Sequence, residues 1–307
     1  MQKIEFTRAV KPRHLKMTIE GLPGTGKTFT ALSILTHLTE GGRITVLDTE
    51  NGRSGEYIGE TTKDGVVLNY DTCIIQVATP EMVIEALNVA ERNRYNAIII
   101  DTFSAEWAAI LQEKDEIVGK KSSNDFTVWG SLSPRHARVI SAINAANLHV
   151  IMTIRSKIGH EMVPIELENG RKTHEVVEIG LQPIQRPETP YEFSFRGVID
   201  HAHDMRFAKS PCPELFEKAF NRPGREVATV LKDWLAKGGQ LTPPEELKRL
   251  CRLKGYSDPQ LARFLAQCWD VKATDLADML SSASPDQIEA ARQKLVNAPP
   301  NVAYSSN

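Results

Sequence analysis

Short apolar runs recur between Lys16 and about Lys209, and longer stretches with helical spacing separate them. A continuously apolar run is typical of a buried parallel strand, because helices cover both faces of such a sheet. The alternation of these runs with helices predicts an α/β fold with a mostly parallel sheet. The predicted strands are MTIE (17–20), ITVLD (44–48), AIIID (97–101) and HVIMTI (149–154).

The segments between these strands carry helix start and stop signals. TFTALSILTHL (28–38) follows the first strand and is followed by Gly41-Gly42, a common helix stop. Thr79-Pro80 supplies an N-cap residue and a proline for the first helical position. Two more helices are predicted at EWAAILQEK (106–114) and PRHARVISAINAA (134–146).

After residue 154 the pattern changes to a series of extended segments. MVPIELENGRKTHEVVEI (162–179) predicts two strands joined at Asn169-Gly170, because Asn-Gly readily adopts the positive φ angles of a hairpin turn. Further strands are predicted within 191–200 and 203–209, and they give the sheet an antiparallel end. A helix over 227–234 then ends before a glycine pair.

That glycine pair, Gly238-Gly239, predicts a domain boundary. Beyond it, three capping boxes of the form S/T-x-x-E/Q begin at Thr242, Ser257 and Ser284, and each has a proline near the first helical position. Apolar residues then recur at helical spacing, which is typical of a helix core. The predicted organisation is a core of residues 1–237, a helical module of residues 238–298 and a disordered tail of residues 299–307.

The overall composition indicates a broad class of protein but no particular function. The 307 residues are 41% hydrophobic and 25% charged, as in an ordinary soluble globular protein, and the net charge of −2 means that any DNA binding must come from a local patch. No apolar run approaches the roughly 20 residues that span a bilayer, and the N-terminus lacks the apolar stretch of a signal peptide. The cysteines have no CxxC spacing, which favours reduced thiols. We therefore expect a cytoplasmic protein without a membrane partner.

The strongest chemical signal is GLPGTGKT, directly after the first predicted strand and before the first helix. It matches G-x-x-x-x-G-K-[ST], the phosphate-binding loop or P-loop, whose backbone N–H groups and following helix N-terminus surround phosphates. Lys27 is predicted to reach the β- and γ-phosphates of ATP, and Thr28 to bind Mg²⁺. The expected nucleotide-binding residues are Gly21, Leu22, Pro23, Gly24, Thr25, Gly26, Lys27, Thr28 and Phe29.

Asp101 supplies a second element of the same chemistry. It ends the apolar strand 97–101 and therefore lies at the carboxyl edge of the predicted sheet, where the P-loop also lies. A carboxylate at that position can hold Mg²⁺ through water. We expect Asp101 and Thr28 to form the metal site.

Glu50 is the best candidate for positioning the attacking water. In AAA+ enzymes a Glu directly follows the metal-binding Asp, whereas Thr102 follows Asp101 here. The sequence also has no Arg-rich lid of a nucleotide kinase and no N-K-x-D of a GTPase. Glu50 follows the strand 44–48 at the same sheet edge as the phosphates, where it can orient water. The alternative is a polar strand end or a nearby helix cap. The predicted catalytic residues are Glu50, Lys27 and Asp101.

Two segments resemble the RecA-type recombinase core. VLDTENG after the P-loop helix resembles the strand end at which a Glu activates water in that family. IMTIRSKIGH (151–160) resembles the RecA segment in which a γ-phosphate-sensing strand end leads into the second DNA-binding loop. The resemblance places the candidate γ-phosphate sensor at Thr153. RecA-type proteins carry a Gln at that position.

The chain also resembles a phage-encoded group of RecA-like ATPases, the Sak-type single-strand annealing and recombination proteins. The shared pattern is the P-loop, D-T-E, the strand-end Asp, GLQPIQR (180–186) and YEF (191–193), and Lys209-Ser-Pro211 stands where the family has a K-x-R strand. It covers about residues 15–235. The resemblance implies a RecA-like P-loop core, single-stranded DNA as a partner and a homo-oligomer, either a ring or a filament.

In RecA-like oligomers a Lys or Arg of the next subunit often contacts the γ-phosphate. Lys209 fits that position by resemblance, while Pro211 stands where the family has its Arg. Arg206 is a possible substitute, and an exposed basic strand is the alternative interpretation.

The same resemblance implies two DNA-binding loops. The first would lie in KDEIVGKKSSNDFTVW (114–129), and the second in the region 154–178 with its predicted hairpin. Several glutamates balance the basic residues of the second region, so a solvated mixed-charge hairpin is the alternative. The candidate DNA contacts are Lys120, Lys121, Arg155, Lys157, Arg171 and Lys172.

The leading hypothesis is an ATP-dependent DNA-binding recombination protein that promotes single-strand annealing or strand exchange. Two alternatives stay open: an annealing or scaffold protein that hardly hydrolyses ATP, and a replicative helicase-like or loader ATPase. The C-terminal helices can bind DNA, a single-strand-binding protein or a neighbouring subunit, or serve only the fold. His201 and His203 have metal-ligand spacing on a strand, but no third ligand has convincing spacing.

Overall fold

The computed structural model describes residues 14–121, 125–166, 172–236, 243–254, 256–272 and 275–298. Its strands are β1 (Lys16–Gly21), β2 (Ile44–Asp48), β3 (Asp71–Ile74), β4 (Ala97–Asp101), β5 (His149–Glu166), β6 (Lys172–Pro183), β7 (Phe195–Ile199), β8 (Asp204–Lys209) and β9 (Ala219–Asn221). Its helices are α1 (Lys27–Thr39), α2 (Pro80–Arg92), α3 (Ser104–Lys121), α4 (Asp125–Ala145), α5 (Thr189–Glu192), α6 (Arg225–Ala236), α7 (Pro243–Leu253), α8 (Asp258–Trp269), α9 (Leu276–Ser282) and α10 (Pro285–Asn297), with the 3₁₀ turn η1 (Arg53–Tyr57).

The strands form one sheet in the order β3-β2-β4-β5-β1-β7-β8-β9, and β6 pairs with β5 outside this path. The pairs from β3 to β7 are parallel, whereas β8, β9 and β6 pair antiparallel with their neighbours. The expected α/β fold with a mostly parallel sheet, antiparallel late strands and C-terminal helices is confirmed. The four predicted strands are present, and β3 and β9 are additional.

The late strands differ from the prediction in one respect. The segment 191–200 was expected to open the antiparallel end of the sheet, but β7 runs parallel to β1. Tyr191 and Glu192 belong to the short helix α5, which begins next to Pro190, so the strand starts only at Phe195. Proline favours the first turn of a helix and thereby moves the strand start. The antiparallel end begins one strand later, at β8.

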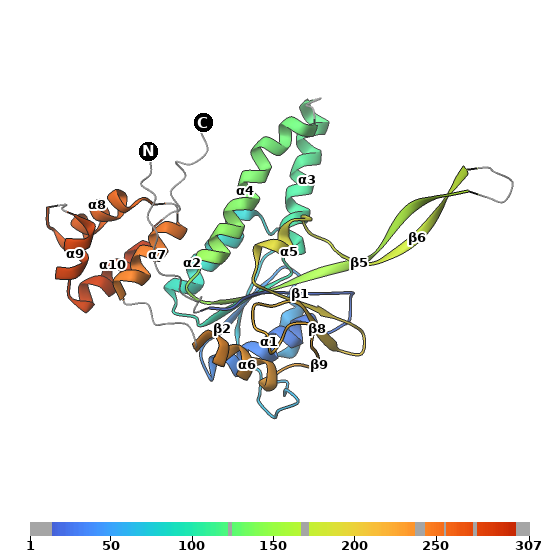
Figure 1. Ribbon diagram of the computed structural model, residues 1–307, viewed down its shortest axis with the longest axis horizontal. Coiled ribbons are helices and arrows are strands. Elements are labelled where there is room, and N and C mark those ends of the chain that lie inside the picture. The colour runs from blue at the N-terminus through green and yellow to red at the C-terminus, as the bar shows by residue number, and fades with distance from the viewer. Residues whose placement is uncertain are drawn as a thin grey trace.

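Helices cover both faces of the sheet, as the continuously apolar strands require. In β4, Ile99 packs into the cluster under α1 and α6, while Ile98 and Ile100 pack into the cluster under α2 and α4. Alternating side chains of one strand therefore feed two hydrophobic cores. Figure 1 shows α1 and α6 on one side of the sheet and α2 and α4 on the other.

Two pairs of elements extend away from this core in Figure 1, the helices α3 and α4 and the strands β5 and β6. Most of the region 114–129, in which the first DNA loop was predicted, is helical, because α3 runs to Lys121 and α4 starts at Asp125, and residues 122–124 lie outside the described part of the chain. A small cluster explains the longer helices: Trp107 stacks on Trp129 at 5.6 Å beside buried apolar side chains of both helices. The predicted helix start at Pro134 is also wrong, since Pro134 lies inside α4.

The β5–β6 hairpin is longer than predicted. The strand expected over 149–154 and the first arm of the hairpin are one continuous strand, β5, and β6 pairs with it from Ser156 to Glu166. The predicted turn at Asn169-Gly170 lies outside the described residues. One strand therefore begins in the core and ends in the hairpin.

The C-terminal helices have a hydrophobic cluster of their own, formed by apolar side chains of α7 to α10. The capping boxes at Ser257 and Ser284 are both present, whereas Thr242 and the tail 299–307 lie outside the described residues. In Figure 1 these helices lie beside α2 and α4, and α7 contacts α4 while α10 contacts α2. Within the described part of the chain, no helix is long and apolar enough to cross a membrane.

The start of β5 generates a stability prediction. Burial, and then the charge of Lys16, lower the pKa of His149 from 6.5 to about 4, and Nδ1 of its ring accepts the backbone N–H of Leu15 at 3.0 Å. The unfolded chain therefore takes up this proton first as the pH falls from about 6.5 toward 4, and the folded state loses stability over that window. Between pH 7 and 4.5 we expect His149 to contribute a loss of about 2 kcal/mol.

Urea denaturation of the wild type and of His149→Asn at both pH values measures this contribution. Asparagine keeps an acceptor for the Leu15 N–H but does not titrate. The variant should show a flatter dependence of the unfolding free energy on pH. An equal loss in the two proteins would contradict the prediction.

Candidate nucleotide-binding site

The loop between β1 and α1 forms one wall of a cavity of about 990 Å³ at the carboxyl edge of the parallel strands. That volume lies in the range of small-molecule sites. The described lining residues are Pro23, Gly24, Gly26, Lys27, Thr28, Phe29, Thr30, Ser33, Glu50, Arg53, Glu56, Tyr57, Thr61, Lys63, Asp101, Arg155, His203, Arg222 and Pro223.

Two glycines are required by the shape of this loop. Gly26 precedes α1 with a φ of 87°, a left-handed conformation that only glycine adopts without strain. At Gly21 a Cβ atom would lie 2.6 Å from the carbonyl oxygen of Ile199, so no side chain fits there. The P-loop glycines thus set both the turn and its close packing against β7.

Lys27 is the first residue of α1, and its ammonium group points back along the loop. Its Nζ donates to the carbonyl oxygens of Gly21 and Leu22 at 3.1 and 2.9 Å. Burial lowers the pKa of Lys27, and the negative charges of Asp101 and Glu50 oppose that shift. A phosphate is a stronger partner for an ammonium group than two carbonyls are, so this lysine is suited to a phosphate ligand.

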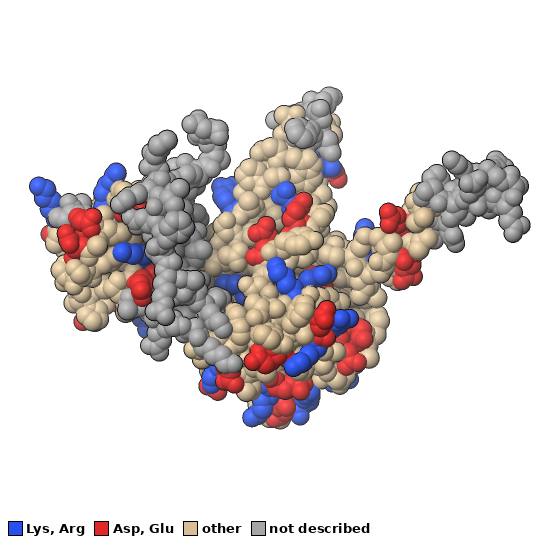
Figure 2. Space-filling view, viewed as in Figure 1, with Lys and Arg blue, Asp and Glu red and all other residues tan. Residues whose placement is uncertain are grey.

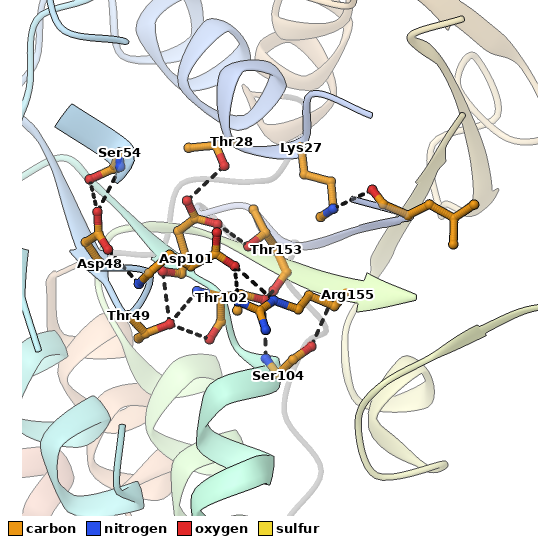
Figure 3. Close-up of polar contacts among 12 residues, drawn as sticks. Lys27, Thr28, Asp48, Thr49, Ser54, Asp101, Thr102, Ser104, Thr153 and Arg155 are labelled. Atoms are coloured by element: carbon orange, nitrogen blue, oxygen red, sulfur yellow. Dashed lines mark hydrogen bonds and ion pairs between the residues drawn. The ribbon is translucent and has the colours of Figure 1, made fainter. Parts of the chain in front are cut away.

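Thr28, Asp101 and Thr153 form a chain of hydrogen bonds next to the loop. The Thr28 hydroxyl donates to Oδ2 of Asp101 at 2.8 Å, and the Thr153 hydroxyl donates to Oδ1 at 2.5 Å (Figure 3). Burial raises the pKa of Asp101, the two hydroxyl donors lower it, and the charges of Glu50 and Asp48 raise it further. Hydroxyl and carboxylate oxygens are hard donors that suit Mg²⁺, which would also neutralise the acidic side of the cavity. Thr28 and Asp101 therefore fit the metal predicted for them.

Asp48 organises the loop that carries Glu50. Its fully buried carboxylate accepts the backbone N–H groups of Glu50 at 2.7 Å, Gly52 at 3.2 Å and Ser54 at 2.8 Å, and also the Ser54 hydroxyl. Burial alone would raise the pKa of Asp48, but the hydrogen bonds from Ser54, Glu50 and Gly52 outweigh it and lower the pKa. An ionised Asp48 thus fixes the conformation of the chain just after β2.

Thr49 joins the ends of β2 and β4. Its backbone N–H donates to the carbonyl oxygen of Asp101 at 2.7 Å, and its hydroxyl accepts the N–H of Thr102 at 2.8 Å. The Thr102 hydroxyl in turn donates to the carbonyl oxygen of Thr153 on β5 at 2.7 Å. Thr102 therefore links β4 to β5. It stands directly after Asp101, at the position where AAA+ enzymes carry a Glu.

Glu50 points across the cavity toward β5. Its Oε1 accepts Nε and Nη2 of Arg155 at 2.9 and 2.6 Å, and the two side chains are 21% and 50% exposed. Arg155 was predicted as a DNA contact from the sequence, and the structure places it in the cavity opposite the P-loop. Glu50 and the P-loop thus face one another, and an arginine is paired with the glutamate.

The remaining wall consists of residues that the sequence motifs did not single out for the site. Tyr57 packs edge-to-face on Phe29 at 5.8 Å. A ring nitrogen of His203 lies 3.0 Å from the carbonyl oxygen of Thr25, and Arg222 donates its N–H to the carbonyl oxygen of His203. His203 and Arg222 have positive φ values of 63° and 46°. They come from turns far along the chain, and only the order of β7, β8 and β9 brings them to the P-loop.

The candidates for a contact with a neighbouring subunit lie on β8, away from the cavity lining. Lys209 donates its ammonium group to the carbonyl oxygens of Pro190 and Tyr191 at 3.3 and 2.9 Å. Arg206 is 63% exposed and lies 4.0 Å from Glu217. Both roles stay predictions.

The DNA candidates are placed only in part. Lys157 is exposed on β5, two residues beyond Arg155 and on the same side of the strand. Arg171 and the side chains of Lys120, Lys121 and Lys172 lie outside the described part of the structure.

The strand, glycine loop and helix, together with the hydrogen bond from Thr28 of the loop to Asp101, define a P-loop nucleotide-binding protein. A family model described as an AAA domain matches residues 13–178, which is more than half of the chain. The chain therefore belongs to the AAA domain family. A search of curated proteins gave no match.

Solved structures with a similar arrangement include the RadB recombinase and a second protein described as an ATPase domain. The RadB structure has 15% sequence identity and a TM-score of 0.41, and the match covers 70% of this chain and 90% of that one. The ATPase domain has 9% identity and a TM-score of 0.36, with 68% of this chain and 85% of that one covered.

Removal of the Lys27 ammonium group should abolish tight nucleotide binding and leave the fold intact. We expect Lys27→Ala to weaken binding of a fluorescent ATP analogue by more than about tenfold, since a charge-assisted hydrogen bond is lost. Lys232→Ala is the matched control, because Lys232 forms an exposed ion pair with Glu40 on another face. Retained tight binding in Lys27→Ala with an unchanged melting curve would contradict the phosphate role.

Asp48→Asn should misplace Glu50 without removing it. The amide N–H₂ of the new side chain would then face the backbone N–H donors of the loop, so we expect about 1–3 kcal/mol less stability. We also expect a kcat for ATP hydrolysis about 10- to 100-fold lower, because Glu50 is misplaced, and a KM that changes little. Asp71→Asn on the exposed edge strand β3 is the control. Steady-state ATPase kinetics measure both variants, and an unchanged kcat in Asp48→Asn would show that this loop does not position the catalytic group.

Proposed function

We propose that the protein is a Mg²⁺-dependent ATPase with a RecA-like core that acts on single-stranded DNA in annealing or strand exchange in the cytoplasm. The observation that carries the proposal is the position of Glu50 across the cavity from Lys27, Thr28 and Asp101. A glutamate opposite a P-loop is placed to orient water for in-line attack on a γ-phosphate.

Lys27 and Glu50 have separate roles in the proposed hydrolysis of ATP. Lys27 contacts the β- and γ-phosphates, and Glu50 orients the attacking water and accepts its proton. The water oxygen forms a bond to the γ-phosphorus, the bond to the β–γ bridging oxygen breaks, and its electrons stay on ADP. A bound Mg²⁺, held by Thr28 and Asp101, supplies charge neutralisation of the phosphate oxygens. Tyr57 offers an aromatic face for the base.

DNA binding rests on the resemblance to Sak-type and RecA-type proteins and on the shape of the molecule. The α3–α4 and β5–β6 pairs extend away from the sheet (Figure 1), and both start near the site, because α3 begins at Ser104 directly after β4 and β5 contains Arg155. Figure 2 shows acidic and basic side chains intermixed on the face in view, so DNA contacts there must be local. Lys157, Lys120, Lys121, Arg171 and Lys172 are the proposed phosphate contacts.

We also propose that the protein assembles into an oligomer of identical subunits. A ring or filament of identical subunits would bring Arg206 or Lys209 of one subunit to the γ-phosphate of the next, as the family resemblance implies. Residues 238–298 would form a separate helical module, which the independent hydrophobic cluster of α7 to α10 supports. That module is a candidate site for a single-strand-binding protein.

A second candidate is an annealing or scaffold protein that binds ATP and hardly hydrolyses it. The pairing of Glu50 with Arg155 favours it, because Oε1 of the glutamate is already engaged by a guanidinium and the side chain is turned toward β5. The two candidates differ in whether turnover is the working step.

Glu50→Gln separates them. If hydrolysis through Glu50 is the function, the variant should bind ATP normally and lose at least about 100-fold in turnover, the usual contribution of a general base. Glu60→Gln, an exposed glutamate further along the chain, is the control. Annealing of complementary strands should fall with turnover.

Survival of annealing in Glu50→Gln would instead support the scaffold function. Unwinding of a forked duplex by the wild type would point to a helicase. Absence of ATP turnover in the wild type, with and without single-stranded DNA, would overturn the proposed ATPase.

A further inference from the structure

Arg155 occupies the boundary between the sheet and the β5–β6 hairpin. It is the last residue of β5 that pairs with β1, opposite Gly21 of the P-loop, and Ser156 is the first that pairs with β6. Its carbonyl oxygen accepts the N–H of Ile184 just after β6 at 2.7 Å. A movement of the hairpin therefore acts directly on the backbone of Arg155.

The backbone of Arg155 is also tied to the second extended element. Its N–H donates to the hydroxyl of Ser104 at 2.9 Å, and Ser104 is the buried first residue of α3 (Figure 3). Both elements that extend from the core thus meet at one residue. That same residue holds the side chain of Glu50.

We propose that Arg155 is a positioning residue that holds Glu50 in a resting state, and that displacement of the β5–β6 hairpin by a nucleic-acid phosphate backbone releases Glu50 for hydrolysis. This inference rests on the proposed ATPase function and adds a coupling between the hairpin and the water-orienting glutamate. It assigns Arg155 to control of the site rather than to contact with the reacting phosphate.

The geometry of the pair supports a resting state. Both Nε and Nη2 of Arg155 donate to the same oxygen, Oε1 of Glu50, at 2.9 and 2.6 Å. An oxygen that already accepts two charge-assisted hydrogen bonds is a poor acceptor for a further water proton. The contact holds the Glu50 carboxylate toward β5, and departure from the guanidinium frees Oε1 to accept a proton of the attacking water.

The exposure of the pair makes release easy. The Arg155 side chain is 50% exposed, and an ion pair in contact with water is only weakly stabilising. When the paired and released states differ little in free energy, a ligand with a modest preference for the released state is enough to shift the population toward it. A phosphate is a strong bidentate partner for a guanidinium, so a backbone lying along Lys157 would compete directly for Arg155.

Steady-state ATPase kinetics test the coupling through Arg155→Ala. Without DNA we expect its kcat to rise about two- to fivefold over the wild type, while KM for ATP stays unchanged. This factor corresponds to the small stabilisation that a half-exposed ion pair provides. Stimulation by single-stranded DNA should shrink by the same factor, because the variant is already released. Arg155→Lys keeps one charged donor and should give intermediate values. Arg92→Ala removes a similar exposed pair with Glu85 on α2 and should match the wild type.

A second measurement does not depend on turnover. Hydrogen exchange of the backbone amides in 50–54 and 156–163 should increase in Arg155→Ala and in Glu50→Gln, and the double variant should exchange no faster than either. This non-additive pattern is the signature of one shared contact. It is readable even if the wild type hydrolyses no ATP, so failure of the proposed function and failure of the coupling are distinguishable.

Three results would overturn the inference. A fall in kcat of Arg155→Ala without DNA would make Arg155 a catalytic contact of the phosphates. An unchanged basal kcat with weaker single-stranded DNA binding would make it a plain DNA contact. Additive hydrogen-exchange effects of the two single variants would show that Glu50 and Arg155 are not coupled.

Discussion

The hydrogen bonds that Asp101 accepts from Thr28 and Thr153 join the P-loop helix to two neighbouring strands, and the candidate site depends on them. They form only because β1, β2, β4 and β5 are parallel and end at one edge of the sheet. A buried carboxylate needs such donors, since an unpaired charge in the interior is costly. The candidate metal ligands and the strand ends are therefore held by the same contacts.

The short sequence D-T-E combines three separate tasks at one strand end. Asp48 fixes the loop through buried backbone hydrogen bonds, Thr49 joins β2 to β4, and Glu50 alone faces the cavity. Thr102 adds a link from β4 to β5. The rigid part of the site thus ends at Glu50, whose side chain is half-buried and paired with an arginine of a different strand. Hydrogen bonds thus fix the backbone around Glu50, while its side chain is held by a single exposed ion pair.

Sequence patterns succeeded where a short segment determines its own structure. The P-loop glycines, the capping boxes at Ser257 and Ser284 and the apolar strands all carry local signals, and the structure has each of them. The patterns failed over 114–129, where the stacked Trp107 and Trp129 extend two helices through a polar stretch. They also placed the antiparallel end one strand early, because strand direction depends on pairing partners rather than on the strand itself.

The sequence by itself determined that this protein has a P-loop, and it predicted Asp101 and Glu50 beside that loop because both lie at the ends of recognisable strands. Only the tertiary structure decided what surrounds them. His203 and Arg222 reach the cavity through the order of β7, β8 and β9, and Arg155 meets Glu50 across 105 positions of the chain. Contacts of that kind depend on how strands are ordered in a sheet, and one residue's local sequence carries no information about its distant partner.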